Sequence, residues 1–466
     1  MPYILAKYWS KQPIVLAIIM QRDIEKDLKK WFDTPDRRPL LVRGARQVGK
    51  SYTVRTFGQE HFSNTVEVNF EQRPEYASCF ETLVPPEIID RLSILTRQNI
   101  HPGKTLLFLD EIQKCPPAIT SLRYFYEQLP HLHVIAAGSL LDFTLTSEQI
   151  GVPVGRVQYL YMKPLSFAEF LSALAENKAR SFVAEGDLAK TGPAIHEHLI
   201  SLVKKYMFTG GMPSVVNRFL EQNAVASCLD IQTSITQTFR DDFGKYAKKA
   251  GHAHIEKVFL SSAKMVGRRF KYSQVDPETK SRDLKDALYL LERAGIMYRV
   301  RATSGAGLPF EAEADDRTFK TVFLDVGLMQ NICGLFEETL FATNLMSIYA
   351  GALAEQFVGQ ELLAYQDPLR APQLFFWTRK EPGSAAEVDY LYPHGSTILP
   401  IEVKAGTTGA LRSAHLFLEK YKRSIIIKIS QSTFSFADRV LCVPLYAIGE
   451  IPRLLDTVAE VSTLLT

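Results

Sequence analysis

Short apolar runs alternate with amphipathic stretches along the first part of the chain. The apolar runs have the length of buried strands, and they lie near residues 38–44, 63–70, 105–110, 132–138 and 157–163. The stretches between them have helical periodicity. Strands that alternate with helices are typical of a parallel sheet with helices on both faces. The pattern therefore predicts an α/β domain.

The loop after the first strand has a phosphate-binding sequence. Residues 44–51 are GARQVGKS, which fits the pattern G-x-x-x-x-G-K-[ST]. Its glycines let backbone N–H groups wrap phosphates at a helix N-terminus, and its lysine can reach the β and γ phosphates. We therefore expect this segment to bind ATP and Mg²⁺, through Gly44, Ala45, Arg46, Gln47, Val48, Gly49, Lys50, Ser51 and Tyr52, with Ser51 as a Mg²⁺ ligand.

The third apolar run ends in two acids. The sequence LLFLDEIQ has the form of a Walker B strand, and it ends in Asp110 and Glu111. We expect Asp110 to hold Mg²⁺ through water and Glu111 to polarise the attacking water. The alternative is a strand that ends in two solvated acids.

Two further residues are predicted to touch the nucleotide. Ser139 ends the apolar run LHVIAAGS, where a side chain would contact the γ-phosphate or the attacking water. Arg156 precedes the last strand, and it would stabilise charge on its own nucleotide or on that of a neighbouring subunit. The second role requires a homo-oligomer. The alternative for Arg156 is a solvated surface group.

Basic residues gather in the middle of the chain. Residues 281–302, SRDLKDALYLLERAGIMYRVRA, have leucines on one helical face, then Gly295, then a strand-like segment. Helix, turn, helix and β-wing indicate a winged helix, which would contact DNA through a helix in the major groove and through flanking lysines and arginines. The alternative is a module that mediates only domain packing.

The last part of the chain combines carboxylates with a lysine. The order of elements there is αβββαβ. Glu402 and Lys404 share one face of a strand, Asp389 lies on the preceding strand, and Glu355 lies on the first helix. Phosphodiester hydrolysis needs acids that hold Mg²⁺ or Mn²⁺ and a lysine that activates water. The alternative for Glu402 and Lys404 is a surface pair.

Composition limits the protein class. The 466 residues suggest two to four domains, and 46% hydrophobic with 23% charged residues is typical of a soluble globular protein. A net charge of +3 does not by itself indicate nucleic-acid binding. The apolar run PIVLAIIM is too short to span a membrane. We expect a cytoplasmic protein without a membrane anchor, in which residues 1–19 are extra or poorly ordered and Met20 is a candidate start.

Several segments together resemble a known family. PLLVRGARQVGKS, LLFLDEIQ, AAGSLLDF and GRVQYLYMKPLSFAEFL are similar to prokaryotic AAA+ superfamily P-loop ATPases with a C-terminal PD-(D/E)XK nuclease-like domain, and the resemblance extends from about Met20 to the end. It implies a RecA-like core, a helical lid with the segment YMFTGGMPSVV, and a winged-helix middle. It also implies that Asp389, Glu402 and Lys404 are the nuclease motif residues and Glu355 the acid of the first helix. Val388 stands where that family often has proline.

The expected organisation is therefore an ATPase core at 20–180, a helical lid at 181–250, a winged-helix-like domain at 251–310 and a nuclease-like domain at 317–466. The expected function is ATP binding and hydrolysis, with a C-terminal domain that acts on DNA. The first alternative is a nucleotide-driven switch whose C-terminal domain binds DNA or a protein partner without cleavage. The second is a DNA-binding regulator with a vestigial nucleotide site.

Overall fold

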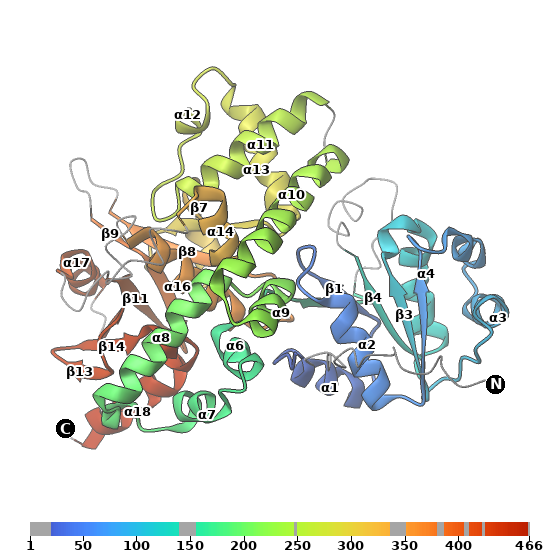
Figure 1. Ribbon diagram of the computed structural model, residues 1–466, viewed down its shortest axis with the longest axis horizontal. Coiled ribbons are helices and arrows are strands. Elements are labelled where there is room, and N and C mark those ends of the chain that lie inside the picture. Colours follow the sequence, from blue (N-terminus) through green and yellow to red (C-terminus); the bar gives the residue numbers. More distant parts are fainter. Residues whose placement is uncertain are drawn as a thin grey trace, which may run out of the picture.

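A computed structural model describes residues 20–138, 155–246, 249–335, 351–379, 386–404, 410–421 and 425–464. These residues form three sheets. One sheet lies at one end of the molecule and two at the other, with long helices running diagonally between them (Figure 1). Two predictions, for residues 1–19 and for Ser139, lie outside the described residues.

The first sheet contains all five predicted strands. Its neighbouring strands pair only in parallel, in the order β2-β3-β4-β1-β5. The strands are β1 (Leu40–Arg43), β2 (Asn64–Asn69), β3 (Thr105–Asp110), β4 (His133–Ala137) and β5 (Gln158–Tyr161). The predicted parallel α/β architecture of this part is confirmed.

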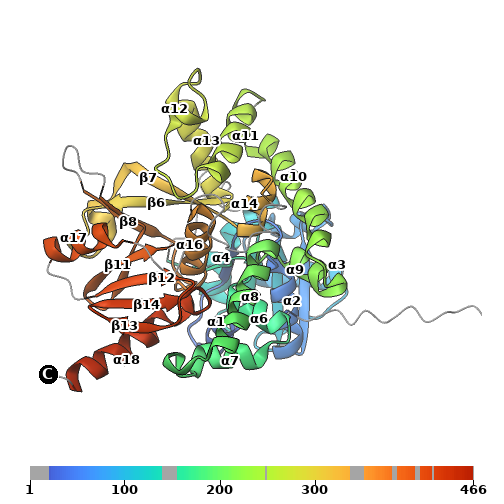
Figure 2. The same cartoon turned by 60° about the vertical axis from the view of Figure 1, so that its left-hand side comes forward.

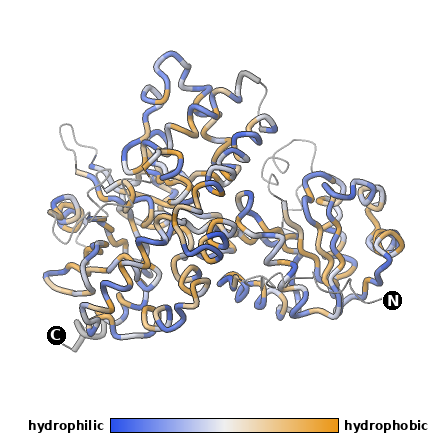
Figure 3. The backbone as a smooth tube through the Cα atoms, viewed as in Figure 1, coloured by the Kyte–Doolittle hydropathy of each residue, from blue (hydrophilic) through white to orange (hydrophobic). Residues whose placement is uncertain are grey.

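Helices cover both faces of this sheet. Alternate strand residues point to opposite faces, so Leu40 and Val42 pack with α1 (Glu25–Asp33) and α2 (Lys50–His61). Leu41 packs on the other face, in a second core with α3 and α4. These two helices are α3 (Pro85–Thr96) and α4 (Pro116–Gln128). Hydrophobic residues follow the strands, and hydrophilic residues gather on the outer turns (Figure 3).

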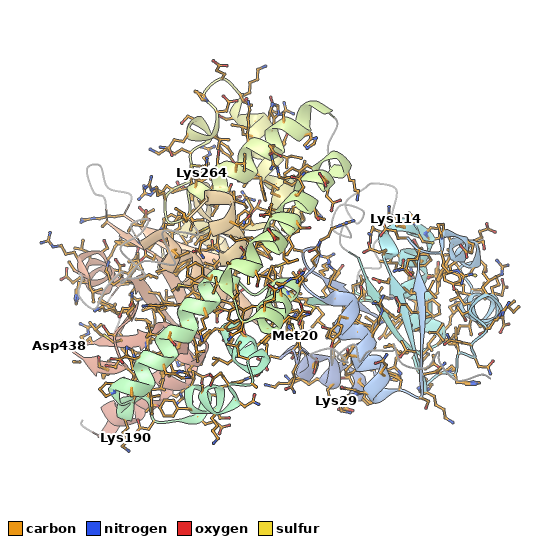
Figure 4. All side chains as sticks on the ribbon, viewed as in Figure 1. Met20, Lys29, Lys114, Lys190, Lys264 and Asp438 are labelled. Carbon is orange, nitrogen blue, oxygen red and sulfur yellow. The ribbon has the colours of Figure 1, made fainter. Side chains whose placement is uncertain are left out.

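A helical segment follows the sheet. It consists of α6 (Phe167–Ala173), α7 (Asn177–Glu185), α8 (Pro193–Thr209), α9 (Pro213–Gln222) and α10 (Cys228–Tyr246). A capping box begins α6: the side chain of Ser166 accepts a hydrogen bond from the N–H of Glu169, and the side chain of Glu169 accepts one from the N–H of Ser166. Met20 is buried and lies where α1 meets this segment (Figure 4). Short 3₁₀ helices occur at Pro74–Phe80, Ile112–Lys114, Leu188–Lys190, Val225–Ser227, Phe310–Glu313 and Leu445–Glu450.

The middle of the chain has the predicted succession of helices and hairpin. It contains α11 (Lys249–Lys264), α12 (Tyr272–Val275), α13 (Ser281–Arg293), β6 (Met297–Thr303) and β7 (Asp315–Phe323). The hairpin does not stand alone, because β6 also pairs in parallel with β8 (Leu374–Thr378) of the following part. The expected boundary between 310 and 317 therefore falls inside a sheet, ordered β7-β6-β8-β9.

The C-terminal part has the predicted helix, three strands, helix and strand, with one break and one difference. The second strand is broken at Asp389 into β9 (Glu387–Val388) and β10 (Tyr390–His394). β8 pairs with β6, so the three strands do not share one sheet. The other sheet has the order β10-β11-β12-β14-β13, and Figure 2 shows β11, β12, β14 and β13 one below another. The remaining elements are α14 (Val326–Cys333), α16 (Ala352–Ala364), β11 (Thr397–Val403), α17 (Arg412–Tyr421), β12 (Ile426–Ser430), β13 (Ser435–Ala437), β14 (Val440–Pro444) and α18 (Ile451–Leu464). Among the described residues, every helix is too short or too polar to cross a bilayer.

Candidate functional site

The loop between β1 and α2 has the backbone of a phosphate cradle. Gly44 and Gly49 have φ angles of 144° and 98°. A Cβ atom at Gly44 would lie 2.3 Å from the carbonyl oxygen of Met162, so only glycine fits there. Gly49 gives α2 no side-chain cap, which leaves the first N–H groups of that helix available to an oxyanion.

Lys50 already lies within this loop. Its side chain is buried, and Nζ donates hydrogen bonds of 2.8 Å to the carbonyl oxygens of both Gly44 and Ala45. When a phosphate binds in the loop, phosphate oxygens could replace these two carbonyl oxygens as acceptors for the ammonium group. The role of Lys50 toward phosphates stays a prediction.

Ser51 and Asp110 meet at the carboxyl end of the sheet. Ser51 Oγ donates a 2.9 Å hydrogen bond to Asp110 Oδ2, which also accepts a 3.2 Å bond from Asn69 Nδ2. Burial raises the pKa of Asp110, and the Ser51 hydrogen bond partly offsets this. A hydroxyl beside a buried carboxylate is a donor set that suits Mg²⁺, so these two residues fit the predicted ion.

Glu111 has an unusual backbone. Its φ of 52° and ψ of 42° are left-handed, which costs about 1–3 kcal/mol for a residue other than glycine and is concentrated at functional sites. Its carboxylate accepts a hydrogen bond from Gln113 Nε2. Glu111 directly follows β3, so it lies at the carboxyl end of the sheet, as the phosphate loop after β1 does.

Two neighbours of Asp110 were not anticipated from the sequence. Asn69 ends β2 opposite Asp110, and Arg55 lies one turn along α2 from Ser51. Arg55 Nη2 is 2.6 Å from Glu67 Oε1 and 3.9 Å from Asp110 Oδ2. Asn69 could have been found from the sequence, because it is a polar residue at the end of a predicted strand, as Asp110 is.

The phosphate loop is braced by other segments. Arg46 forms an ion pair with Asp242 of α10, with 2.7 Å between Nε and Oδ2, and Asp242 is buried. On the other side, Arg22 Nη1 donates a 2.9 Å hydrogen bond to the carbonyl oxygen of Val48. The exposed residues of the predicted set are Gln47 and Tyr52.

Arg156 does not reach the phosphate loop of its own chain. Gln158 pairs with Leu40 at the start of β1, so Arg156 lies at the amino end of the sheet, opposite the loop. Its Nε is 3.2 Å from Glu127 Oε1 at the surface. Strand direction therefore argues against a role toward its own nucleotide, and a role toward a neighbouring subunit and a solvated surface group both stay open.

The turn predicted as the lid motif packs near the phosphate loop. Gly211 N donates a 2.6 Å hydrogen bond to Asp325 Oδ2, and a Cβ atom at Gly210 would lie 2.1 Å from Asp325 Oδ1. Burial raises the pKa of Asp325 to about 6. Pro213, which begins α9, has its Cγ 3.5 Å from the Cβ position of Gly49. The C-terminal part therefore holds the turn that touches the loop.

A second buried acid joins the same parts. Glu361 of α16 accepts 3.1 Å hydrogen bonds on both oxygens from the backbone N–H of Phe167, the first residue of α6. Burial raises its pKa to about 8. α16 also carries Glu355 in its first turn, so one helix contacts both the ATPase part and the C-terminal acids.

The four residues predicted for the C-terminal site do come together. Lys404 Nζ lies 2.7 Å from Glu402 Oε1, and Asp389 Oδ2 accepts a 2.8 Å bond from the N–H of Val403. Glu355 joins them through Lys320, whose Nζ lies 2.8 Å from Glu355 Oε1 and 3.4 Å from Asp389 Oδ1.

Lys320 and Glu387 were missed by sequence reasoning. Lys320 is buried on β7, and its Nζ is also 2.7 Å from Glu387 Oε1. Burial opposes the charge of Lys320, but the carboxylates outweigh burial and hold its pKa well above the usual value. The sequence signal was a lysine in the mostly apolar segment FKTVFL.

The acids of this cluster are incompletely neutralised. Burial raises the pKa of Glu355 and of Glu402 to about 7 each. Glu402 Oε2 is buried and makes no hydrogen bond within the described residues. Within those residues, no three Asp, Glu, His or Cys side chains are arranged to hold a metal ion. Asp389 and Glu402 with water are the donor set that remains, and Mg²⁺ is often bound by one or two carboxylates.

Comparisons with known families divide the chain into three parts. A family model described as an AAA domain matches residues 36–171. Two family models described as domains of unknown function match residues 200–339 and 350–448.

Individual relatives are distant. The replication factor C large subunit of Methanosphaera stadtmanae is 32% identical over 89 residues, which are 19% of this chain and only 15% of that relative. The walker-type ATPase paby2304 of Pyrococcus abyssi is 15% identical with a TM-score of 0.43, covering 68% of this chain and 96% of that one. The Aeropyrum pernix ORC1 protein in complex with DNA is 14% identical with a TM-score of 0.29, covering 70% and 97%.

Proposed function

Starting from the AAA domain at residues 36–171, we propose that this protein binds and hydrolyses ATP and acts as a nucleotide-driven switch. The observation that carries the proposal is the Ser51–Asp110 hydrogen bond beside the buried Lys50. A hydroxyl, a carboxylate and an ammonium group at a helix N-terminus are the groups that a Mg²⁺-bound triphosphate requires.

Each residue has one task in this proposal. The loop N–H groups and Lys50 hold the β and γ phosphates, and Glu111 orients the attacking water. Ser51 and Asp110 would hold Mg²⁺, which neutralises charge that develops on the phosphate oxygens. Ser139 is proposed to contact the γ-phosphate. Arg156 is proposed to act in a homo-oligomer, on the nucleotide of a neighbouring subunit.

The switch is proposed to run through the braces of the loop. Phosphate binding would change the position of Arg46 relative to Asp242, and so bias α10. Pro213 and the turn held by Asp325 would move with the loop. Because Glu361 ties α16 to the start of α6, a shift of the ATPase part would reach the C-terminal acids. Such coupling requires two alternative arrangements of these contacts.

DNA is the proposed macromolecular partner, in the cytoplasm. The order of α11, α13 and the β6–β7 hairpin is that of a winged helix, and its basic side chains would neutralise phosphates. Those exposed to solvent include Lys264, Arg268, Lys271, Lys280, Arg282 and Lys285.

A second candidate function is metal-dependent cleavage of DNA by a PD-(D/E)XK-like domain. It is favoured by Glu402 Oε2, a buried oxygen that would bind a divalent cation together with Asp389. Lys404 would then position water. The switch without cleavage stands first because Lys320 already supplies positive charge among Glu355, Glu387 and Asp389.

One experiment separates the two functions. Purified protein is incubated with linear, supercoiled and branched DNA, with Mg²⁺ or Mn²⁺, with and without ATP, beside Lys50→Ala, Lys404→Ala and the surface control Lys420→Ala. We expect ATP-dependent phosphate release that only Lys50→Ala abolishes, and intact DNA throughout. Cleavage that disappears in Lys404→Ala would establish the second function instead. An absence of phosphate release from the native protein rejects the first.

A further inference from the structure

A cavity of about 360 Å³ lies between the ATPase sheet and the middle of the chain. Its wall is formed by the carboxyl ends of β1 and β5, by α13 and β6, and by the segment before β8. Of the residues predicted to bind ATP, only Gly44 lines it. The cavity is therefore a neighbour of the phosphate loop and a separate site.

The lining of this cavity is strongly basic. The described lining residues include five cations and one acid, Glu292. Glu292 Oε1 is 2.6 Å from Arg299 Nε, so Arg299 neutralises it. Outside the lining, the exposed Asp316 lies 3.6 Å from Arg301. The net charge remains positive, which favours an anionic ligand. The five cations are Arg43, Lys163, Arg293, Arg299 and Arg301.

Three tyrosines line the same cavity, and each of them contacts one of these cations. Lys163 Nζ is 2.7 Å from the hydroxyl of Tyr298 and 4.0 Å from the centre of its ring. Arg43 Nη1 donates a 3.1 Å hydrogen bond to the hydroxyl of Tyr161. The Arg293 guanidinium lies 5.3 Å from the ring centre of Tyr289, which is 48% exposed at the rim. Cations beside accessible aromatic rings suit a base that stacks and a phosphate that pairs.

We propose that this cavity binds one nucleotide of a single-stranded nucleic acid, with the base on Tyr289 and the phosphates at Arg293 and Lys163. Its volume is that of a small-ligand pocket, and a duplex, whose major groove alone is about 12 Å wide, does not enter it. The cavity adjoins the face of α13 proposed above for duplex DNA, because Lys285 lies one turn before Tyr289, but Lys285 does not line the cavity.

The same wall touches the phosphate loop. A Cβ atom at Gly295 would lie 3.2 Å from the backbone N of Ala45, so the turn after α13 rests on the loop. A bound strand is therefore expected to change ATP turnover, a consequence that rests on the proposed ATPase activity. Strand binding itself does not depend on it.

The test is fluorescence anisotropy of the full chain with a labelled 12-residue oligothymidylate at several salt concentrations. Tyr289→Ala and Arg293→Gln should each weaken binding about tenfold, and Arg293→Gln should lower the slope against log salt by about one. Tyr289→Phe keeps the ring and should bind like the native chain. Lys29→Gln removes one exposed charge from α1, outside both the cavity and the face proposed for duplex DNA, and should change binding less than about twofold.

Competition experiments then distinguish a single strand from a free nucleotide and from a duplex. Unlabelled thymidine monophosphate and a 12-base-pair duplex should compete poorly at equal nucleotide concentration. Effective competition by either ligand overturns the proposal. An equal weakening of strand binding by Lys29→Gln, or an absence of strand binding, also overturns it. The Lys50→Ala variant should retain strand binding, so failure of the ATPase proposal and failure of this one give different results.

Discussion

Lys320 Nζ is buried and lies 2.8 Å from Glu355 Oε1, at the centre of a group of partly buried carboxylates. The same ammonium group is 2.7 Å from Glu387 Oε1 and 3.4 Å from Asp389 Oδ1. It supplies the kind of charge that a divalent cation would supply to these acids. The cluster can therefore be held together by side chains alone, while Glu402 Oε2 remains without a hydrogen bond in the described residues.

Removal of that ammonium group should destabilise the protein. Lys320→Met puts an apolar side chain among partly buried carboxylates that then have no counter-charge, and we expect the free energy of unfolding to fall by about 3–5 kcal/mol. Millimolar Mn²⁺ should recover part of the loss, because the acids then have room for a cation. Urea unfolding with and without Mn²⁺ measures both effects. Lys257→Met, which breaks a surface pair with Asp276, is the control, and an equal effect of both variants would contradict the argument.

Stability should fall as the pH rises toward 8. The pKa of Glu361 is about 8 in the folded protein, against an ordinary value of 4.5. Between these values the folded state holds a proton that the unfolded state has lost, so the free energy of unfolding decreases with rising pH, by up to about 1.4 kcal/mol per pH unit.

Glu361→Gln isolates this contribution from the other buried acids. Glutamine keeps an oxygen for the Phe167 N–H and cannot ionise, so we expect the variant to lose less stability than the native chain between pH 6 and 8. Urea unfolding at pH 6, 7 and 8 compares them. Parallel pH profiles would show that Glu361 ionises normally.

Glu111→Gln should separate binding from hydrolysis. Glutamine preserves the shape of the side chain but cannot polarise water as a carboxylate does, so phosphate release should fall by about 100-fold or more. ATP affinity should stay within about threefold of native, because the loop and Lys50 are untouched. Glu75→Gln, at an exposed surface pair with Arg73, should leave turnover unchanged. Loss of ATP binding in Glu111→Gln would show that Glu111 maintains the structure of the binding site, and would contradict a role limited to hydrolysis.

The Arg46–Asp242 pair should carry the signal of nucleotide binding into α10. In the native chain we expect Mg·ATP to change amide hydrogen exchange in α10. Asp242→Asn removes the charge that Arg46 faces, and should abolish that change while ATP still binds. Asp241→Asn alters the exposed neighbouring position and serves as the matched control. An exchange response that survives in Asp242→Asn would rule out this route.

The ATPase half follows closely from local sequence. Buried parallel strands need apolar runs, and Gly44 has no alternative because a Cβ atom would meet the Met162 carbonyl. The phosphate loop and the Asp110 strand were predictable for these reasons. Strand direction argues against the prediction that Arg156 reaches the nucleotide of its own chain. Arg156 precedes β5, which runs parallel to β1, so it lies at the end of the sheet opposite the phosphate loop.

The C-terminal half was predictable in outline only. Glu402 and Lys404 are two residues apart on a strand, which fixes their shared face. The pairing of β6 with β8 joins segments about seventy residues apart, and nothing in either strand specifies that partner. The position of Lys320 among the acids depends on this pairing. The long-range pairing of β6 with β8 thus determines that Lys320 meets Glu387 and the other acids.

Titration calorimetry with Mg·ATP tests the central claim most directly. The native chain should show saturable binding at one site, and Lys50→Ala should weaken it by about 30-fold or more, because a charge-assisted contact with phosphate is lost. Lys29→Ala, on the surface of α1, should bind like the native chain. Absence of heat and saturation in the native chain, or equal affinity of native and Lys50→Ala, would contradict the account.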